Sequence, residues 1–144
     1  MQIHICQVCQ YVAYGESPDK CPICEAGNER FIRNDHVFEE SEAKSKEGAI
    51  KHIPSVTVKH VCGLIPEESC TDVLVRVGKT LHPTTDTHYI MFIDCYVDHK
   101  LVARAHLTPN SYPSVVFHLK EKGSKVQVTE FCSLHGHWQA ETNF

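Results

Sequence analysis

Histidines and cysteines recur in this chain at spacings that suit metal binding, and the densest group lies near the C-terminus. Cys132 and His135 are separated by two residues, so both side chains can reach one metal ion from a single turn. Two ligands do not complete a coordination shell. A second cluster begins with His82 and ends with His88, and a further candidate is His52. We interpret these three stretches as one metal site with four imidazoles and one thiolate.

Two Cys-x-x-Cys pairs near the N-terminus predict a second metal site. Two such pairs form two tight turns whose four thiolates can close a tetrahedral site, which suits Zn²⁺ or a single iron ion. The spacing does not distinguish the two metals. A module of this size buries too little surface to fold alone, so the ion would supply most of its folding free energy. The four candidate ligands are Cys6, Cys9, Cys21 and Cys24.

The composition is typical of a globular protein. Of the 144 residues, 42% are hydrophobic and 22% are charged. The formal net charge of −4 gives no support for nucleic-acid binding, which usually needs a basic face. No apolar run approaches the roughly 20 residues that span a bilayer, and the N-terminus does not read as a signal peptide. We therefore expect a cytoplasmic protein that binds neither nucleic acid nor a membrane.

Four of the eight cysteines lie outside the two Cys-x-x-Cys pairs. Cys62 and Cys70 could pair with each other or bind a metal with His60, and free thiols are expected in a reducing compartment. Cys95 lies in an apolar strand pattern, which predicts a buried small hydrophobic residue. The fourth is Cys132 of the candidate site.

The chain after residue 50 has the pattern of β-strands. Residues 71–77 place three valines on one face, and residues 125–129 alternate similarly. Further strands are predicted at 89–97, 101–107 and 114–119, with turns at 98–100 and 122–124. Short strands at this spacing, with no convincing helix, predict a mainly β fold with an antiparallel, immunoglobulin-like β-sandwich.

The sequence predicts two folded parts. Residues 1–34 form the four-cysteine module, and residues 49–144 form the β-sandwich. Residues 35–48 are polar and charged without apolar periodicity, which indicates a linker or a short exposed helix.

The N-terminal module resembles the rubredoxin-like domain that ends rubrerythrins. Besides the cysteines, the resemblance rests on Tyr11, Val12, Gly15, Pro18 and Phe31. It implies an iron centre that passes one electron at a time. A zinc ribbon that only stabilises the N-terminus is the alternative, because ligand spacing does not separate the two.

Residues from about 49 to 144 resemble the superoxide reductase family, also called desulfoferrodoxins and neelaredoxins. The matching motifs, in order, are Lys51-His52-Ile53-Pro54, His82-Pro83, His88-Tyr89-Ile90 and Cys132-x-Leu134-His135-Gly136 with Trp138. The resemblance implies one mononuclear iron with a thiolate as axial ligand and four imidazoles as equatorial ligands. The implied ligands are Cys132, His52, His82, His88 and His135.

The resemblance implies one-electron reduction of superoxide to hydrogen peroxide. Neutral imidazoles suit ferrous iron, and a single thiolate raises electron density at the metal opposite a vacant sixth position. The reaction would need two protons and an electron donor, for which a rubredoxin-type protein or a flavoprotein is expected. A homo-oligomer, either a dimer or a tetramer, is also implied.

The resemblance places Lys51 at the mouth of the site, where a positive charge would attract an anion. An ordinary solvated lysine is the alternative. The chain departs from the family one residue earlier: many members have a glutamate there, and this chain has Ile50. Glu47 could substitute only if its loop bends back. The interval between His52 and His82 is also longer than usual, so we expect an enlarged loop around residues 63–69.

Two other functions remain open at this point. One is an electron-transfer iron protein without superoxide turnover, and the other is a zinc-ribbon protein-binding module fused to a β-sandwich. The other histidines are expected to be surface or hydrogen-bonded core residues. We place His137 outside the ligand set and expect Trp138 to pack around the cysteine loop. The histidines without a partner at ligand spacing are His4, His36, His60, His99, His106 and His118.

Overall fold

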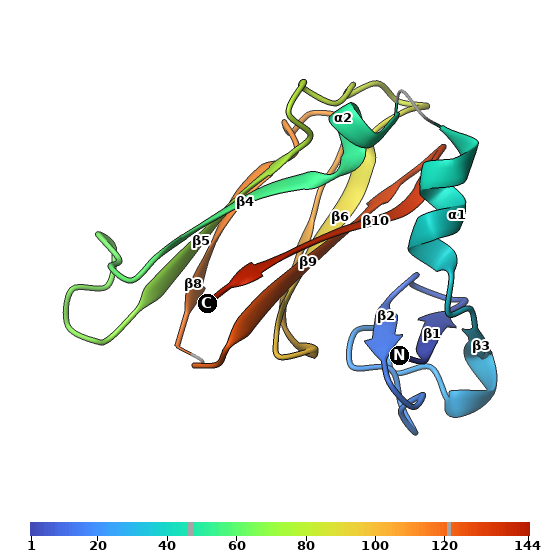
Figure 1. Ribbon diagram of the computed structural model, residues 1–144, viewed down its shortest axis with the longest axis horizontal. Coiled ribbons are helices and arrows are strands. Elements are labelled where there is room, and N and C mark those ends of the chain that lie inside the picture. Colours follow the sequence, from blue (N-terminus) through green and yellow to red (C-terminus); the bar gives the residue numbers. More distant parts are fainter. Residues whose placement is uncertain (46–47, 121) are drawn as a thin grey trace. The chain divides into compact units, whose positions relative to one another are not determined.

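The computed structural model describes residues 1–45, 48–120 and 122–144 of the chain (Figure 1). It contains two compact units, Met1–Glu40 and Ser41–Phe144. The division falls inside the polar segment 35–48. Among the described residues, no helix combines the length and the apolar character needed to cross a lipid bilayer.

The first unit is a three-stranded antiparallel sheet with β1 at its centre. Its elements are β1 (Ile3–Cys6), β2 (Val12–Tyr14), the 3-10 helix η1 (Asn28–Arg30) and β3 (Phe31–Arg33). Helix α1 (Val37–Lys44) begins in this unit, and its Val37 and Phe38 are buried with Ile3, Ile5 and Val12. The segment is thus a helix with a buried apolar end, and the prediction of an exposed helix is wrong at that end.

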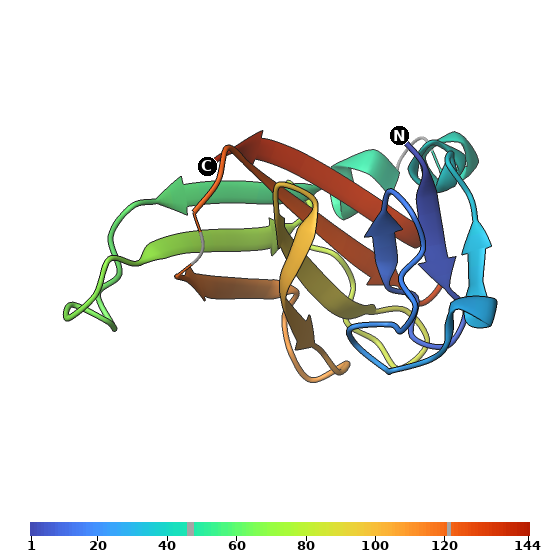
Figure 2. The same cartoon turned by 90° about the horizontal axis from the view of Figure 1, so that it is seen from below.

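The second unit consists of two antiparallel sheets, with strand orders β10-β9-β6-β7 and β4-β5-β8. The short helix α2 (Gly48–His52) leads into β4. Figures 1 and 2 show the β4–β5 connection projecting at the end of this unit opposite α2. The strands are β4 (Pro54–Lys59), β5 (Thr71–Val77), β6 (Ile90–Val97), β7 (Lys100–His106), β8 (Ser114–Leu119), β9 (Lys125–Cys132) and β10 (Gly136–Asn143).

Alternation of apolar residues explains how the two sheets pack. In β5, Val73, Val75 and Val77 are buried while the residues between them are less so. They share one core cluster with residues of β6, β8 and β9, including the fully buried Ile93 and Cys95. The prediction of a mainly β, antiparallel fold is confirmed, and so is the burial of Cys95. Strand β9 extends three residues beyond the predicted 125–129, which carries Cys132 to the end of its sheet.

Candidate metal centres

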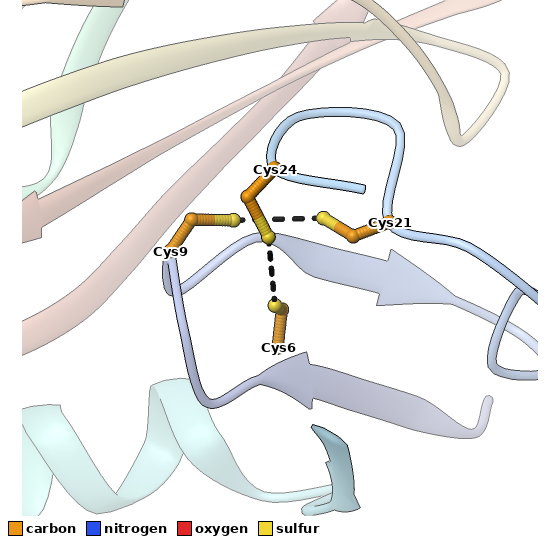
Figure 3. A group of neighbouring side chains, drawn as sticks. All are labelled: Cys6, Cys9, Cys21 and Cys24. Atoms are coloured by element: carbon orange, nitrogen blue, oxygen red, sulfur yellow. Dashed lines mark hydrogen bonds between the residues drawn. The ribbon is translucent and has the colours of Figure 1, made fainter. Parts of the chain in front are cut away.

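The four N-terminal cysteines converge in the first unit, with their sulfur atoms directed toward one another (Figure 3). Sγ of Cys6 lies 3.6 Å from Sγ of Cys24, and Sγ of Cys9 lies 3.5 Å from Sγ of Cys21. Metal–sulfur bonds of about 2.3 Å in a tetrahedron place neighbouring sulfurs at about 3.8 Å. The spacing of the four sulfurs therefore suits one tetrahedral metal ion.

The two Cys-x-x-Cys turns share one backbone geometry. Each ends at a residue in the left-handed region, Gln10 and Glu25, both with φ of 63°. In each turn the N–H of that residue donates to the carbonyl of the first cysteine at 2.9 Å, to Cys6 and Cys21 respectively. Burial raises the pKa of the Cys9 and Cys21 thiols. A bound cation has the opposite effect, because it stabilises the thiolate form of its ligands.

The second candidate centre is assembled from separate segments of the second unit. His52 is the last residue of α2, and Cys132 is the last residue of β9. His135 lies in the turn between β9 and β10, while His82 and His88 lie in the connection between β5 and β6. One ligand atom from each of His52, His88, Cys132 and His135 lies within 4.8 Å of the others. The structure places His82 beside this group, in contact with His52 and Cys132.

The four imidazole rings occupy the corners of a square. Neighbouring ring centroids are separated by 4.6 Å (His52–His82), 4.7 Å (His82–His88), 4.9 Å (His88–His135) and 5.0 Å (His135–His52). The His52–His88 diagonal is 6.3 Å. Neighbouring rings are nearly perpendicular, at 75° to 87°, whereas the diagonal rings are inclined by only 29°. These four rings can therefore hold one ion from four equatorial directions.

The ligand atoms converge on the same point. His52 Nε2 lies 3.1 Å from His82 Nε2 and 3.3 Å from His135 Nδ1. Metal–nitrogen bonds of about 2.1 Å give about 3.0 Å between neighbouring corners of a square. Cys132 Sγ lies 3.4 Å from His82 Nε2 and 3.8 Å from His135 Nδ1. Since the cysteine is fully buried and His135 is exposed, the sulfur lies on the protein side of the square.

Hydrogen bonds orient two of the rings for metal binding. His52 Nδ1 lies 2.7 Å from the carbonyl oxygen of Gly48, and His82 Nδ1 lies 2.7 Å from that of Pro83. A carbonyl accepts only, so each Nδ1 carries the proton and each Nε2 directs its lone pair to the centre. Outer hydrogen bonds of this kind are typical of metal-binding histidines.

An unpaired nitrogen supports a metal at this position. His88 Nε2 is buried and has no hydrogen-bond partner among the described residues. A buried polar atom left unpaired costs about 1–3 kcal/mol, and a metal ion would remove that cost.

Trp138 packs against two of the histidines. Its ring stacks on that of His52, with 4.6 Å between the centroids and 18° between the planes, and its Nε1 donates to the His135 carbonyl at 3.2 Å. The predicted packing of Trp138 around the cysteine loop is confirmed.

The electrostatics of the site favour neutral imidazoles. Burial lowers the pKa of His52 and of His82 to about 4. Burial also lowers the pKa of His88, with smaller effects from the charges of His135 and Lys51. Burial raises the pKa of Cys132, and hydrogen bonds from the backbone near it act in the opposite direction. Neutral imidazoles bind a cation without first losing a proton.

Lys51 lies on α2 beside His52, and its side chain is exposed. Its positive charge contributes to the lowered pKa of both His52 and His88, so it acts on the site electrostatically. Ile50, at the position of the family glutamate, is 57% exposed and offers no ligand atom. Glu47, the possible substitute, lies outside the described residues.

Comparison with known proteins identifies the family. A family model described as "Desulfoferrodoxin" matches residues 41–141, and one described as "Rubrerythrin, rubredoxin-like domain" matches residues 4–32. The chain belongs to the desulfoferrodoxin family. Both resemblances stated from the sequence motifs are thereby confirmed.

Individual relatives agree with this family. A desulfoferrodoxin from Desulfarculus baarsii is 39% identical over 67 residues, which cover 46% of this chain and 51% of the relative, about half its length. A desulfoferrodoxin homolog from Archaeoglobus fulgidus is 27% identical over 97% of this chain and 96% of its own. A solved structure of the superoxide reductase (neelaredoxin) from Ignicoccus hospitalis matches with a TM-score of 0.58 and 26% identity. That match covers 74% of this chain and 89% of the other.

The lowered histidine pKa values predict how the stability of the metal-free desulfoferrodoxin unit depends on pH. Between pH 6.5 and 4 the unfolded chain binds protons at His52 and His82 that the folded chain excludes. The free energy of unfolding should therefore be highest above pH 6.5 and fall toward pH 4, by at most about 3 kcal/mol per histidine. Denaturant titrations followed by fluorescence of Trp138, the single tryptophan, measure this fall.

The His82→Gln variant should show a smaller fall over the same pH range. His106→Gln is the matched control, because His106 is exposed at the end of β7 and lies outside the site. An equal pH dependence in the wild type and the His82→Gln variant would contradict the assignment of the lowered pKa.

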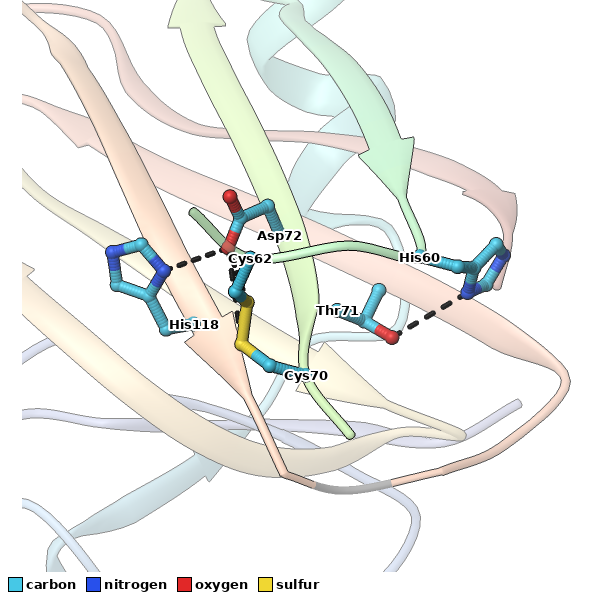
Figure 4. Close-up of a disulfide and its surroundings, with 6 residues drawn as sticks. All are labelled: His60, Cys62, Cys70, Thr71, Asp72 and His118. Atoms are coloured by element: carbon cyan, nitrogen blue, oxygen red, sulfur yellow. Dashed lines mark hydrogen bonds and ion pairs between the residues drawn. A yellow bond between two sulfur atoms is a disulfide. The ribbon is translucent and has the colours of Figure 1, made fainter. Parts of the chain in front are cut away.

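A third group of side chains differs from the prediction. The expected free thiols of Cys62 and Cys70 are joined in a disulfide (Figure 4). His118, expected to be a surface or hydrogen-bonded histidine without a partner at ligand spacing, lies 2.7 Å from Asp72 and in reach of both cysteines. The possible metal partner His60 contacts Thr71 instead, at 3.4 Å. This group of side chains could not be predicted from the sequence, because Asp72 and His118 are far apart along the chain. They meet through the pairing of β5 with β8.

Proposed function

We propose that the chain is a superoxide reductase that reduces superoxide to hydrogen peroxide at a mononuclear iron. The observation that carries the proposal is the square of four imidazoles with a buried cysteine sulfur on its protein side. Four imidazoles and one thiolate would leave a six-coordinate iron able to take a small anion, and the exposed His135 marks the side of the site that solvent reaches. The superoxide reductases among the relatives support the same activity.

In this proposal His52, His82, His88, His135 and Cys132 would hold the iron, with the cysteine reaching it from the buried side of the site. Iron held there would supply the one-electron redox chemistry of the reaction. The hydrogen bonds from His52 and His82 to backbone carbonyls keep the rings oriented and raise their basicity. The stacking of Trp138 on His52 keeps water from that edge of the site.

Lys51 provides the positive charge that draws in the anionic substrate. Because it precedes the ligand His52 in the last turn of α2, its position is tied to that of the metal site. A charge fixed beside an open anion-binding position raises the rate of association, and salt screens the effect.

The Lys51→Ala variant should bind superoxide more slowly, by roughly tenfold at low ionic strength, because the attraction of the ammonium group is lost. The rate of oxidation of the reduced iron by a superoxide pulse measures this step. Lys125→Ala is the matched control, since Lys125 is an exposed lysine at the other end of the strand that bears Cys132. An unchanged rate and salt dependence in Lys51→Ala would contradict the role given to this lysine.

The stoichiometry of the reaction tests the proposed activity. A reductase supplied with electrons should form one hydrogen peroxide per superoxide consumed and release no dioxygen. A dismutase would form one peroxide and one dioxygen from two superoxides. Iron that stays reduced in the presence of superoxide would favour the alternative, an electron-transfer protein without superoxide turnover.

For the four-cysteine site we propose either iron or zinc. Iron would make the first unit an electron relay, whereas zinc would leave it a structural module. Two irons per chain, measured by elemental analysis, would support the relay. The electron donor of rubredoxin or flavoprotein type, the dimeric or tetrameric assembly and the cytoplasmic location stay predictions.

A further inference from the structure

A third cluster of potential metal ligands lies at the end of the second unit opposite α2. It consists of Cys62, Cys70, Asp72 and His118, and one ligand atom from each lies within 4.8 Å of the others (Figure 4). We propose that this cluster binds a divalent ion of the zinc class when its two cysteines are reduced. The Cys62–Cys70 disulfide is then the oxidised, metal-free state of the same site.

The sheet fixes two of the four ligands. Asp72 of β5 and His118 of β8 are directly opposite each other in the antiparallel register, so their side chains share one face. His118 Nδ1 lies 2.7 Å from Asp72 Oδ1. Cys70 is two residues before Asp72, and side chains two apart along an extended chain point the same way. Cys62 follows β4, which pairs with β5, and completes the cluster from the other side of the loop.

One contact in the cluster fits a reduced or metal-bound state better than a disulfide. Cys62 Sγ lies 2.7 Å from Asp72 Oδ1, the same oxygen that contacts His118. A disulfide sulfur has no proton to donate, so two atoms with lone pairs face each other at this distance. A thiol proton would convert this contact into a hydrogen bond, and a cation would attract both atoms.

The ligand types point to zinc. Two thiolates, one imidazole and one carboxylate oxygen form a mixed sulfur, nitrogen and oxygen set that suits tetrahedral Zn²⁺. Edges of such a tetrahedron measure about 3.3–3.8 Å, within the span of these four atoms. The two thiolates and the carboxylate also outweigh the charge of the ion, which favours its capture.

The cluster is accessible to ions and to reductants. A pocket of about 370 Å³ is lined by Cys70 and His118 together with Glu68 and Ser69 of the β4–β5 connection. An ion can therefore reach two of the four ligands from solvent. The pocket also gives a dithiol a route to the disulfide.

The interconversion of the two states balances chemically. A dithiol reductant gives two electrons and two protons to the Cys62–Cys70 disulfide, forms its own disulfide and leaves two thiols. Binding of Zn²⁺ then releases the two thiol protons to solvent. In the reverse direction, one hydrogen peroxide takes two electrons from the two bound thiolates and two protons from solvent, which gives the disulfide and two waters and releases the ion.

Zinc uptake by the whole iron-loaded chain tests the proposal. The oxidised protein and protein reduced with a phosphine are each incubated anaerobically with Zn²⁺ and desalted, and iron and zinc are then counted by elemental analysis. We expect one additional zinc per chain in the reduced protein only, with the iron retained. No additional zinc after reduction, or zinc gained only as iron is lost, would overturn the proposal.

Variants locate the added zinc. Cys62→Ser and His118→Gln should abolish the uptake, whereas His60→Gln, a change at a neighbouring histidine outside the cluster, should retain it. Zinc should also slow alkylation of Cys62 and Cys70 in the reduced protein at least about tenfold, as read by mass spectrometry of their peptides. Protection that is unchanged in His118→Gln would contradict the proposed ligand set.

Discussion

The Cys132→Ser variant should lose the sulfur-to-iron charge-transfer band and most of the superoxide-dependent turnover. Cys132 Sγ is the only sulfur among the five described side chains that converge in this centre, and it is fully buried beside the imidazole nitrogens. Loss of an outer hydrogen bond to a ligand already costs 10–100-fold in activity, so loss of the thiolate should cost at least about 100-fold. Visible spectra of the oxidised protein and the rate of peroxide formation measure both effects.

Cys95→Ala is the matched control for this experiment. Cys95 is also a fully buried cysteine of the same unit, but it lies in the core between the sheets and belongs to none of the described ligand groups. The Cys95→Ala variant should leave the charge-transfer band in place and lower mainly the free energy of unfolding, because a small buried side chain is shortened. A Cys132→Ser protein with the wild-type spectrum and turnover would refute the assignment of the axial ligand.

The second large effect should follow removal of the metal from the four-cysteine site. The core of the first unit contains only a few apolar side chains, including Ile5, Val12 and Phe38. A structural Zn²⁺ contributes on the order of 10 kcal/mol to such modules, which exceeds what a core of this size supplies. The Cys9→Ser variant, or a chelator, should therefore unfold residues 1–40 and leave the second unit folded.

Hydrogen exchange measured by mass spectrometry separates the two units in one experiment. Backbone amides of β1 and β2 should exchange rapidly in Cys9→Ser, while those of β6 and β9 should stay protected. Val8→Ser is the control, because Val8 lies in the same turn, is 52% exposed and bears no ligand atom. Equal protection of β1 and β2 in Cys9→Ser and the wild type would contradict the dependence of this unit on its metal.

The sequence was sufficient for those parts of the fold that depend on local patterns. Alternating valines placed β5 correctly, because one face of that strand is buried between the sheets. The candidate ligands could be chosen because short motifs such as Cys132-x-x-His135 keep their geometry within one turn. The confirmed family explains why the order of these motifs was informative.

Features that no local sequence pattern signals could not be predicted. The hydrogen bond from His52 to Gly48 requires α2, a helix of only five residues without a clear apolar period. The cluster around Asp72 and His118 requires the register of β5 with β8, which no local pattern specifies. We expected free thiols at Cys62 and Cys70 because a reducing compartment favours them. The compartment does not determine how close a loop brings two sulfur atoms.

A crystal structure of the reduced, iron-loaded protein with anomalous data at the iron absorption edge tests the central claim most directly. We predict an iron peak within bonding distance of His52 Nε2, His82 Nε2, His135 Nδ1, a ring nitrogen of His88 and Cys132 Sγ. No sixth protein ligand should be present on the solvent side. An absence of iron at this point, or a protein side chain that fills the sixth position in the reduced state, would contradict the account.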